Sequence, residues 1–262
     1  MVANLRLPFD VDDGKDAGVF VSAIRQHGKT KLAQLLADLY IDDDCLVRVF
    51  DTSQAWNSSN IPTKVTLRQP HKIVYPSDQS IIFDISRLYL QQQRFTIQTI
   101  LGTDFQTRVE SPNPKLEQWI IYFFEEAQII LPNGSLRANY AQEAFRTISV
   151  GANYNLGYML ITQRPADVST KAISRCGILY LGKHFESNDI TKLKKFLGWR
   201  KYNDTHERLS SLKKREFYHF DGNKATKFRA PTYRQYRQPT EFNRPSRIRG
   251  FWGNIWYHIK DF

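Results

Sequence analysis

Three residues near the start of the chain have the types and spacing to hold a phosphate group: Gly28, Lys29 and Thr30, within the stretch SAIRQHGKTKLA (22–33). In loops of the pattern GxxxxGK followed by Ser or Thr, backbone amides and the lysine bind phosphates, and the hydroxyl ligates Mg²⁺. Ala23 stands here in place of the first glycine of that pattern. Two interpretations follow: a phosphate loop with a changed first residue, or a chance Gly-Lys-Thr at the start of an ordinary helix.

The flanking sequence favours the phosphate loop. Residues 18–24 form an apolar run without helical period, which is typical of a buried parallel strand. After Gly28, apolar residues recur at helical spacing, at Leu32, Leu35, Leu36, Leu39 and Tyr40. The start of a helix favours a bound anion. The strand–loop–helix order therefore predicts an ATP site at Ala23, Gln26, His27, Gly28, Lys29, Thr30 and Lys31.

Two adjacent acids, Glu125 and Glu126, follow directly on the apolar run 120–124. The carboxyl ends of strands in open α/β sheets line the ligand crevice, whereas an unpaired buried carboxylate is costly. Side chains alternate along a strand, so the two acids are expected to have different tasks. We predict that Glu125 lies near Mg²⁺ with Thr30, and that Glu126 polarises the water that attacks the γ-phosphate. A surface acid pair at a strand end is the alternative.

A neutral amide, Gln163, ends the next strong strand at 156–165. In that place an amide can hydrogen-bond the attacking water or the γ-phosphate, so that strand position follows the nucleotide state. The alternative is a plain strand-to-loop turn marked by Pro165.

The order of periodic segments predicts an α/β fold with a mainly parallel sheet covered by helices on both faces. Besides the segments above, the pattern predicts strands at 45–51, 80–85 and 177–182, a strand signal over 118–132, and helices at 87–101 and 136–148. Residues 52–80 are polar and are expected to form an irregular connection.

The composition limits the class of protein. A chain of 262 residues can bury one substantial core. No run approaches the ~20 apolar residues of a membrane-spanning helix, and the first residues lack an apolar signal core, so export is not expected. Cys45 and Cys176 lie in apolar runs and are expected to be core residues in a reducing compartment. The six histidines show no ligand spacing, so no histidine metal site is expected.

The excess of positive charge lies entirely in the second part of the chain. Residues 1–150 contain 15 basic and 17 acidic side chains, whereas residues 151–262 contain 22 and 9. This asymmetry favours a polyanionic partner bound by one part of the molecule. General solubility would not predict such segregation.

Taken in order, these motifs resemble the FtsK/HerA superfamily of DNA-translocating ATPases. The resemblance rests on the Gly-Lys-Thr loop, the paired acids and, most specifically, ITQRPADVS (161–169). LSSLKKREFYHFDGNKATKFRAP (209–231) is similar to the family's closing strands. The likeness spans roughly residues 15–232 and implies a RecA-like P-loop NTPase domain (1–232) that assembles into a ring around DNA.

The resemblance also implies residue roles. Glu126 takes the place of the catalytic glutamate, Glu125 that of the metal-side acid and Gln163 that of the sensor. Ala23 and Glu125 depart from the usual glycine and aspartate, and Ala152 stands where many relatives have a candidate arginine finger. That role would fall to another arginine, for which we favour Arg146 over Arg137 and Arg175.

Residues 233–262 form a basic, aromatic C-terminal tail. Its apolar residues fall at helical spacing and predict an amphipathic helix over 248–262: Ile248, Phe251, Trp252, Ile255, Trp256, Ile259 and Phe262. Such a helix could pack on its own domain or a neighbouring subunit, or dock to a portal, capsid or membrane surface. The intervening arginines could bind a nucleic-acid backbone: Arg234, Arg237, Arg244, Arg247 and Arg249.

The function that the resemblance implies, together with these patterns, is that of an ATP-hydrolysing, Mg²⁺-dependent double-stranded DNA translocase. As a compact motor, the chain is most similar to viral genome-packaging ATPases. A plasmid, conjugative or HerA-like DNA pump is the second possibility. We expect a pentameric or hexameric ring in the host cytoplasm or the virion. The competing hypotheses are a small-molecule kinase, a nucleotide-gated non-catalytic assembly protein, and a nucleic-acid adaptor with a degenerate ATP site.

Overall fold

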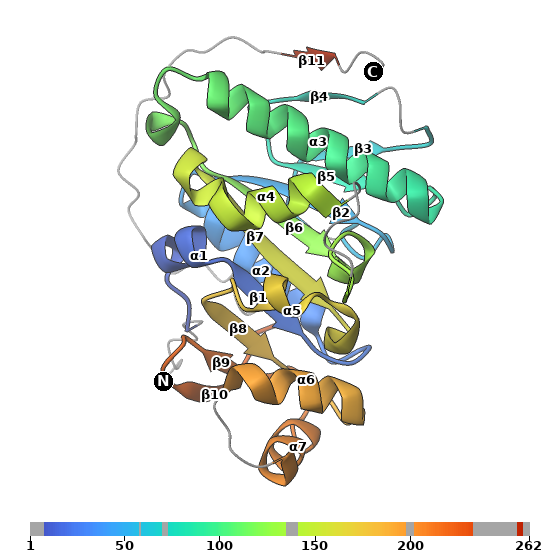
Figure 1. Cartoon of the computed structure of the whole chain (residues 1–262), viewed down its shortest axis with the longest axis vertical. Coiled ribbons are helices and arrows are strands. Elements are labelled where there is room, and N and C mark those ends of the chain that lie inside the picture. The colour runs from blue at the N-terminus through green and yellow to red at the C-terminus, as the bar shows by residue number, and fades with distance from the viewer. Residues whose placement is uncertain are drawn as a thin grey trace.

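The computed structural model describes residues 8–57, 59–69, 73–134, 141–197, 202–232 and 256–258. A nine-stranded sheet with the order β10-β9-β8-β1-β7-β6-β2-β5-β3 runs through it (Figure 1). Its strands are β1 (Val19–Ser22), β2 (Leu46–Asp51), β3 (Thr63–Thr66), β5 (Ile81–Asp84), β6 (Ile120–Glu125), β7 (Leu156–Thr162), β8 (Ile178–Leu181), β9 (Glu216–Phe220) and β10 (Ala225–Arg229). Pairing is parallel from β3 to β8, and only β9 and β10 join antiparallel. The predicted mainly parallel sheet is confirmed.

Helices cover both faces of this sheet. They are α1 (Val11–Ala17), α2 (Lys29–Asp42), α3 (Leu90–Glu110), α4 (Gln142–Val150), α5 (Thr170–Ile173), α6 (Ser187–Leu197) and α7 (Tyr202–Ser210). Figure 1 shows α3 and α4 over one face and α2 behind the other, and each side has its own apolar cluster. In β1, Phe20 belongs to the α3 side, while Val19 and Val21 belong to the α2 side. Burial on both faces explains why the strands are continuously apolar.

A buried ion pair joins this sheet to α3. The Arg48 guanidinium on β2 contacts the Asp104 carboxylate on α3, and both side chains are 1% exposed. The hydroxyls of Tyr75 and Tyr122 donate to the two Asp104 oxygens at 2.9 and 2.7 Å. Arg48 also donates to the Ser77 carbonyl at 3.1 Å. Each charge is therefore compensated, which is the condition for burying a pair without a large penalty.

Several predicted boundaries need correction. The segment 52–80 contains strand β3 and a short strand β4 (Val74–Pro76) and is not wholly irregular. β3 escaped prediction because it lies at the sheet edge, where alternate residues stay exposed and polar. The strand signal over 118–132 ends at Glu125, where the chain turns into a 3₁₀ segment (Ala127–Ile129). α3 continues nine residues past the predicted end at 101, to Glu110.

The helix prediction for the C-terminal tail is wrong where it can be compared. Trp256–His258 forms strand β11, which pairs antiparallel with β4. Trp and Tyr favour strands, and β4 offers unpaired backbone groups, whereas Gly250 and Gly253 weaken a helix. The rest of 248–262, and all five arginines predicted to bind DNA (Arg234, Arg237, Arg244, Arg247 and Arg249), lie outside the described residues.

Cys45 and Cys176 are both buried free thiols, as predicted. Among the helices that the structure describes, none is long and apolar enough to cross a lipid bilayer.

Candidate nucleotide site

The Gly-Lys-Thr stretch lies between a buried strand and a helix, as its flanking pattern predicts. β1 ends at Ser22 and α2 begins at Lys29, with Gly28 as its N-cap. Gly28 has a φ of 111°, a conformation that disfavours any side chain. A Cβ at Gly28 would also approach Arg215 Cγ to 3.1 Å. Glycine is therefore needed at this turn, and the loop leads the backbone into the helix N-terminus.

Ala23, the changed first residue of the loop, fits because its neighbour is a glycine. Its side chain is fully buried. Gly182, at the end of β8, donates its backbone N–H to the Ser22 carbonyl at 2.8 Å. A Cβ placed on Gly182 would lie 2.6 Å from the Ala23 methyl. The missing side chain at 182 thus leaves the room that the methyl at 23 occupies.

His27 connects the loop to strand β9 by hydrogen bonds. Its ring nitrogen Nε2 lies 2.7 Å from the Glu216 carbonyl, so this nitrogen carries the proton and donates it. The Arg215 N–H in turn donates to the His27 carbonyl at 2.9 Å. Burial lowers the pKa of His27, which keeps the ring neutral near pH 7. The His27 side chain therefore faces β9 and not the nucleotide.

A pocket of about 690 Å³ opens over the loop. Five of the predicted nucleotide-binding residues line it: Gln26, Gly28, Lys29, Thr30 and Lys31. Ala23 and His27, predicted with them, do not line the pocket, since their side chains are buried behind the loop. Both predicted acids and Gln163 line the same pocket.

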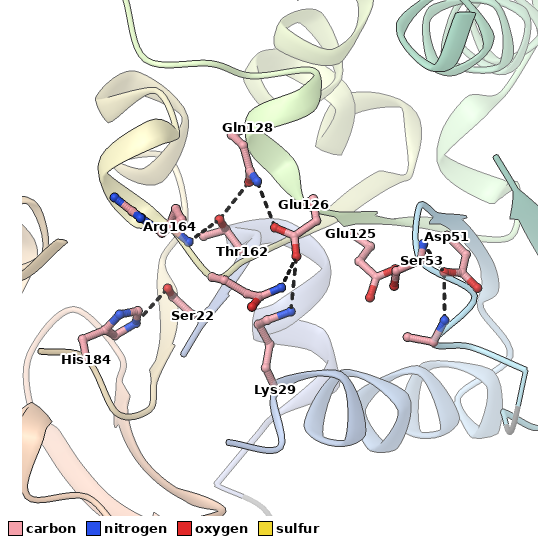
Figure 2. Close-up of polar contacts among 12 residues, drawn as sticks. Ser22, Lys29, Asp51, Ser53, Glu125, Glu126, Gln128, Thr162, Arg164 and His184 are labelled. Carbon is pink, nitrogen blue, oxygen red and sulfur yellow. Dashed lines mark hydrogen bonds and ion pairs between the residues drawn. The ribbon is translucent and has the colours of Figure 1, made fainter. Parts of the chain in front are cut away.

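The polar ends of four parallel strands lie at one edge of the sheet, beside this pocket, because their register aligns them. Ser22 pairs with Thr162, Glu125 with Ile161, and Phe50, the residue before Asp51, with Phe124. Figure 2 shows where these side chains turn: Ser22 contacts His184, Thr162 contacts Gln128, and Asp51 and Glu125 both contact Ser53. Parallel strands bring their carboxyl ends to one edge, which is where the sequence predicts a ligand crevice.

Glu126 is the centre of the polar contacts in Figure 2. Its Oε1 lies 4.0 Å from Lys29 Nζ and accepts a hydrogen bond from Gln163 Nε2 at 2.6 Å. Its other oxygen accepts from Gln128 Nε2 at 2.9 Å. The backbone of Glu126 has a φ of 52°, a left-handed conformation that costs a non-glycine residue about 1 kcal/mol or more. That turn directs the carboxylate back over the loop, and strain of this kind is typical of functional positions.

A second hydrogen-bonded chain holds Glu126 from behind. Thr162 Oγ1 donates to Gln128 Oε1 at 2.8 Å and accepts from the Arg164 N–H at 3.0 Å. The Arg164 side chain reaches Asp189 of α6 at 3.5 Å. Gln128 was not predicted as a site residue, since a single amide in an apolar run gives no signal. The Gln128 amide links the Glu126 carboxylate to Thr162, the last residue of β7.

Glu125 points to the other side of the strand, as the alternation of side chains predicts. It is 4% exposed and accepts a hydrogen bond from Ser53 Oγ at 3.0 Å. Burial, together with the neighbouring Asp51 carboxylate, raises the pKa of Glu125 to about 8. Asp51 is itself held by the backbone N–H groups of Ser53, Ala55 and Trp56 at 3.1 to 3.2 Å. Asp51 thus lies buried beside Glu125, which lines the pocket.

The donor set beside Lys29 suits Mg²⁺. Thr30, Ser53 and Glu125 line one pocket with oxygen atoms, the ligands that this hard cation prefers. A cation would also compensate the crowded Glu125 and Asp51 carboxylates. Thr30 and Glu125 would hold the ion, and Mg²⁺ when bound would supply positive charge to the phosphate oxygens. Both residues were predicted for this task, whereas Ser53 was not.

Neither of the two arginine-finger candidates that the structure describes, Arg146 and Arg175, lines this pocket. Arg146 on α4 lies with its guanidinium 3.8 Å from the centre of the Phe105 ring and 3.6 Å from Glu143. Arg175 and Ala152 line a separate pocket of about 300 Å³ at the amino ends of the strands. Arg137 lies outside the described residues. A finger role for Arg146 would have to act on a neighbouring subunit, and it stays a prediction.

Comparison with solved structures identifies the fold. The genome-packaging NTPase B204 of Sulfolobus turreted icosahedral virus 2, solved with ATPγS, matches with a TM-score of 0.57 at 15% identity, covering 83% of this chain and 98% of that one. VirB4 of Thermoanaerobacter pseudethanolicus matches with a TM-score of 0.68 at 10% identity, covering 88% and 94%. The chain has the fold of these proteins. The conjugation coupling protein TcpA of pCW3 matches with a TM-score of 0.50 at 11% identity, covering 82% of this chain and 60% of that one.

The predicted RecA-like P-loop fold is therefore confirmed, with neighbours of the kinds that the sequence resembles. No protein-family model matches the chain, and no curated protein matches it.

Proposed function

We propose that the chain is an ATP-hydrolysing double-stranded DNA translocase, of the kind that packages a viral genome. The observation that carries the proposal is the convergence of Lys29, Glu126 and Gln163 from three separate segments in one pocket. A structural phosphate site needs the lysine alone. An acid and a neutral amide set against it are the groups that hydrolysis of a γ-phosphate requires.

Each of these side chains has a task in the proposed reaction. Lys29 and the backbone of the loop bind the phosphate chain at the start of α2. Glu126 accepts the proton of the attacking water, and its two hydrogen bonds to Gln163 and Gln128 hold it in position. Gln163 directly follows β7, so exchange of its partner between Glu126 and a bound γ-phosphate would move the end of that strand. Such a movement is what a translocase must transmit to DNA.

The DNA and ring partners follow from charge and from the resemblance. The basic excess in residues 151–262 supports binding to a polyanion, which would be independent of sequence and steeply salt-sensitive. We propose a homo-oligomeric ring of five or six subunits in the host cytoplasm or the virion. In such a ring Arg146 would serve the site of a neighbouring subunit.

A conjugative or plasmid DNA pump is the second candidate. It is favoured by the likeness to VirB4, whose TM-score of 0.68 exceeds the 0.57 of B204, and by the likeness to TcpA. A nucleotide-gated assembly protein without turnover is a third candidate, because Ala23, Glu125 and Ala152 depart from the family pattern.

The deciding experiment is ATP hydrolysis with and without linear duplex DNA, for the wild type beside Glu126→Gln and Lys29→Ala. The expected result is DNA-stimulated turnover that both substitutions abolish. Turnover that DNA leaves unchanged would favour a kinase-like enzyme. Nucleotide binding without turnover would refute the translocase and support the gated assembly protein.

A further inference from the structure

One cation in the pocket comes from a part of the chain to which no role has been assigned. Lys214 precedes β9 and lines the pocket together with Lys29, although 185 positions separate them in sequence. Among the described residues, its ammonium makes no hydrogen bond or ion pair with any other side chain. An exposed lysine is usually solvated, so its position needs a reason.

The backbone on either side of Lys214 is fixed to the phosphate loop. Arg215 donates its N–H to the His27 carbonyl at 2.9 Å and accepts from the Ala230 N–H at 2.8 Å. The Glu216 carbonyl accepts from His27 Nε2 at 2.7 Å, and Phe217 packs edge-on against the same ring, with centroids 5.2 Å apart. The base of the β9–β10 hairpin is thus held against the loop.

Arg215 makes this attachment specific. It adopts a φ of 67°, which is unfavourable for a side chain of its size, and its Cγ packs against Gly28. Turning the backbone in this way at 215 places residue 214 on the pocket side of the hairpin. The strained backbone of Arg215 is held by the hydrogen bonds that join Arg215 and Glu216 to His27, and such strain is consistent with a functional position.

The charge of the pocket also calls for an anion. Four cationic side chains line it, Arg25, Lys29, Lys31 and Lys214, against the two acids Glu125 and Glu126. Like charges gathered in a hollow are stabilised by a polyanionic ligand and repel one another without it.

We propose that Lys214 is a further nucleotide-binding residue, which the β9–β10 hairpin holds over the pocket so that its ammonium binds the phosphate chain of the nucleotide. The inference rests on the proposed nucleotide site but not on hydrolysis or on DNA. It also gives the hairpin a direct contact with the ligand, so that hairpin and phosphate loop respond to the nucleotide together.

The test is equilibrium binding of fluorescently labelled ATP and AMP to the full chain, for the wild type, Lys214→Gln and Lys213→Gln. Lys213 is the matched control: it is the adjacent exposed lysine, carries the same charge and does not line the pocket. We expect Lys214→Gln to raise the Kd for ATP about 5- to 20-fold, the size of a charge-assisted contact. The Kd for AMP should change less than twofold, Lys213→Gln should match the wild type, and Lys214→Arg should restore binding.

Three results would overturn the inference. They are an unchanged Kd for ATP in Lys214→Gln, equal losses in the two glutamine variants, and equal losses for ATP and AMP. Failure of the proposed function is separate: a wild type that binds ATP but does not hydrolyse it refutes the translocase and leaves the Lys214 contact intact. A wild type that binds no nucleotide refutes both.

Discussion

A methyl group added at Gly182 should disturb the phosphate loop without touching any residue that faces the ligand. Its Cβ would lie 2.5 Å from His27 Cδ2 and 2.6 Å from the Ala23 Cβ. Both distances are about 1 Å below ordinary van der Waals contact. The loop is buried and hydrogen-bonded at both points, so it can yield little. We expect Gly182→Ala to lower the free energy of unfolding by about 2 kcal/mol, within the range for overpacked cores.

The same geometry predicts a rescue. Removing the methyl at position 23 eliminates one of the two close contacts, so Ala23→Gly should recover about 1 kcal/mol in the Gly182→Ala background. In the wild-type background Ala23→Gly should instead cost up to about 1 kcal/mol, through added chain entropy and a small void. The two substitutions should therefore be non-additive by about 1 to 2 kcal/mol.

The assay is urea denaturation of the four proteins of this cycle at pH 7 without nucleotide. Gly102→Ala is the matched control, because a Cβ in that helical position meets only the flexible Glu143 side chain, at 3.6 Å. It should be neutral or stabilising by up to about 1 kcal/mol. Additive effects at 23 and 182, or a Gly182→Ala protein as stable as the wild type, would refute the idea that Gly182 makes room for Ala23.

Three other substitutions test separate parts of the molecule. Glu126→Gln should reduce ATP turnover at least ~100-fold while the Kd for ATP stays within about threefold, measured by phosphate release and titration; equal losses in both would instead indicate a binding role. Asp104→Ala should lower the free energy of unfolding by about 3–5 kcal/mol, since it leaves the Arg48 charge buried and unpaired; a loss below ~1 kcal/mol in urea denaturation would contradict this. Burial lowers the pKa of His184 from 6.5 to about 3. The unfolded chain therefore binds a proton below about pH 6.5 that the folded chain does not, so stability should fall by up to about 1.4 kcal/mol per pH unit between pH 6 and 4. In urea denaturation at pH 6 and pH 4, the free energy of unfolding of His184→Gln should fall less with pH than that of the wild type. An equal fall in the two proteins would refute the role of His184.

Local pattern was sufficient for the elements that carry the loop. The run 18–24 and the spacing of Leu32, Leu35 and Leu36 predicted β1 and α2, because a strand buried on both faces and an amphipathic helix have periods that sequence displays directly. Glu125 and Glu126 were predicted to diverge, and they do, although Glu126 follows the end of β6 and its left-handed backbone turn, not strand alternation, directs its carboxylate.

The rest depends on contacts between distant segments. Ser53, Gln128 and Lys214 enter the site from a loop, a 3₁₀ turn and a hairpin base, and nothing next to them in sequence marks them. β4 and β11 are three residues each and pair with one another in a separate two-stranded sheet. Periodicity favoured a helix for the tail because the apolar spacing satisfied one, while the strand partner was invisible in the sequence.

The order of strands in the sheet has a consequence for how the protein is made. β1 is flanked on both sides by strands synthesised much later: Val19 pairs with Met159 on β7 and with Ile178 on β8. Strand β1, which leads into the loop, therefore lacks one neighbouring strand until Thr162 has been synthesised and the other until Leu181 has been synthesised. Such long-range pairings fold slowly and expose apolar edges meanwhile. A nascent chain that stops before β8 should accordingly bind chaperones. Phosphate binding by the loop should appear only after β8 has paired with β1.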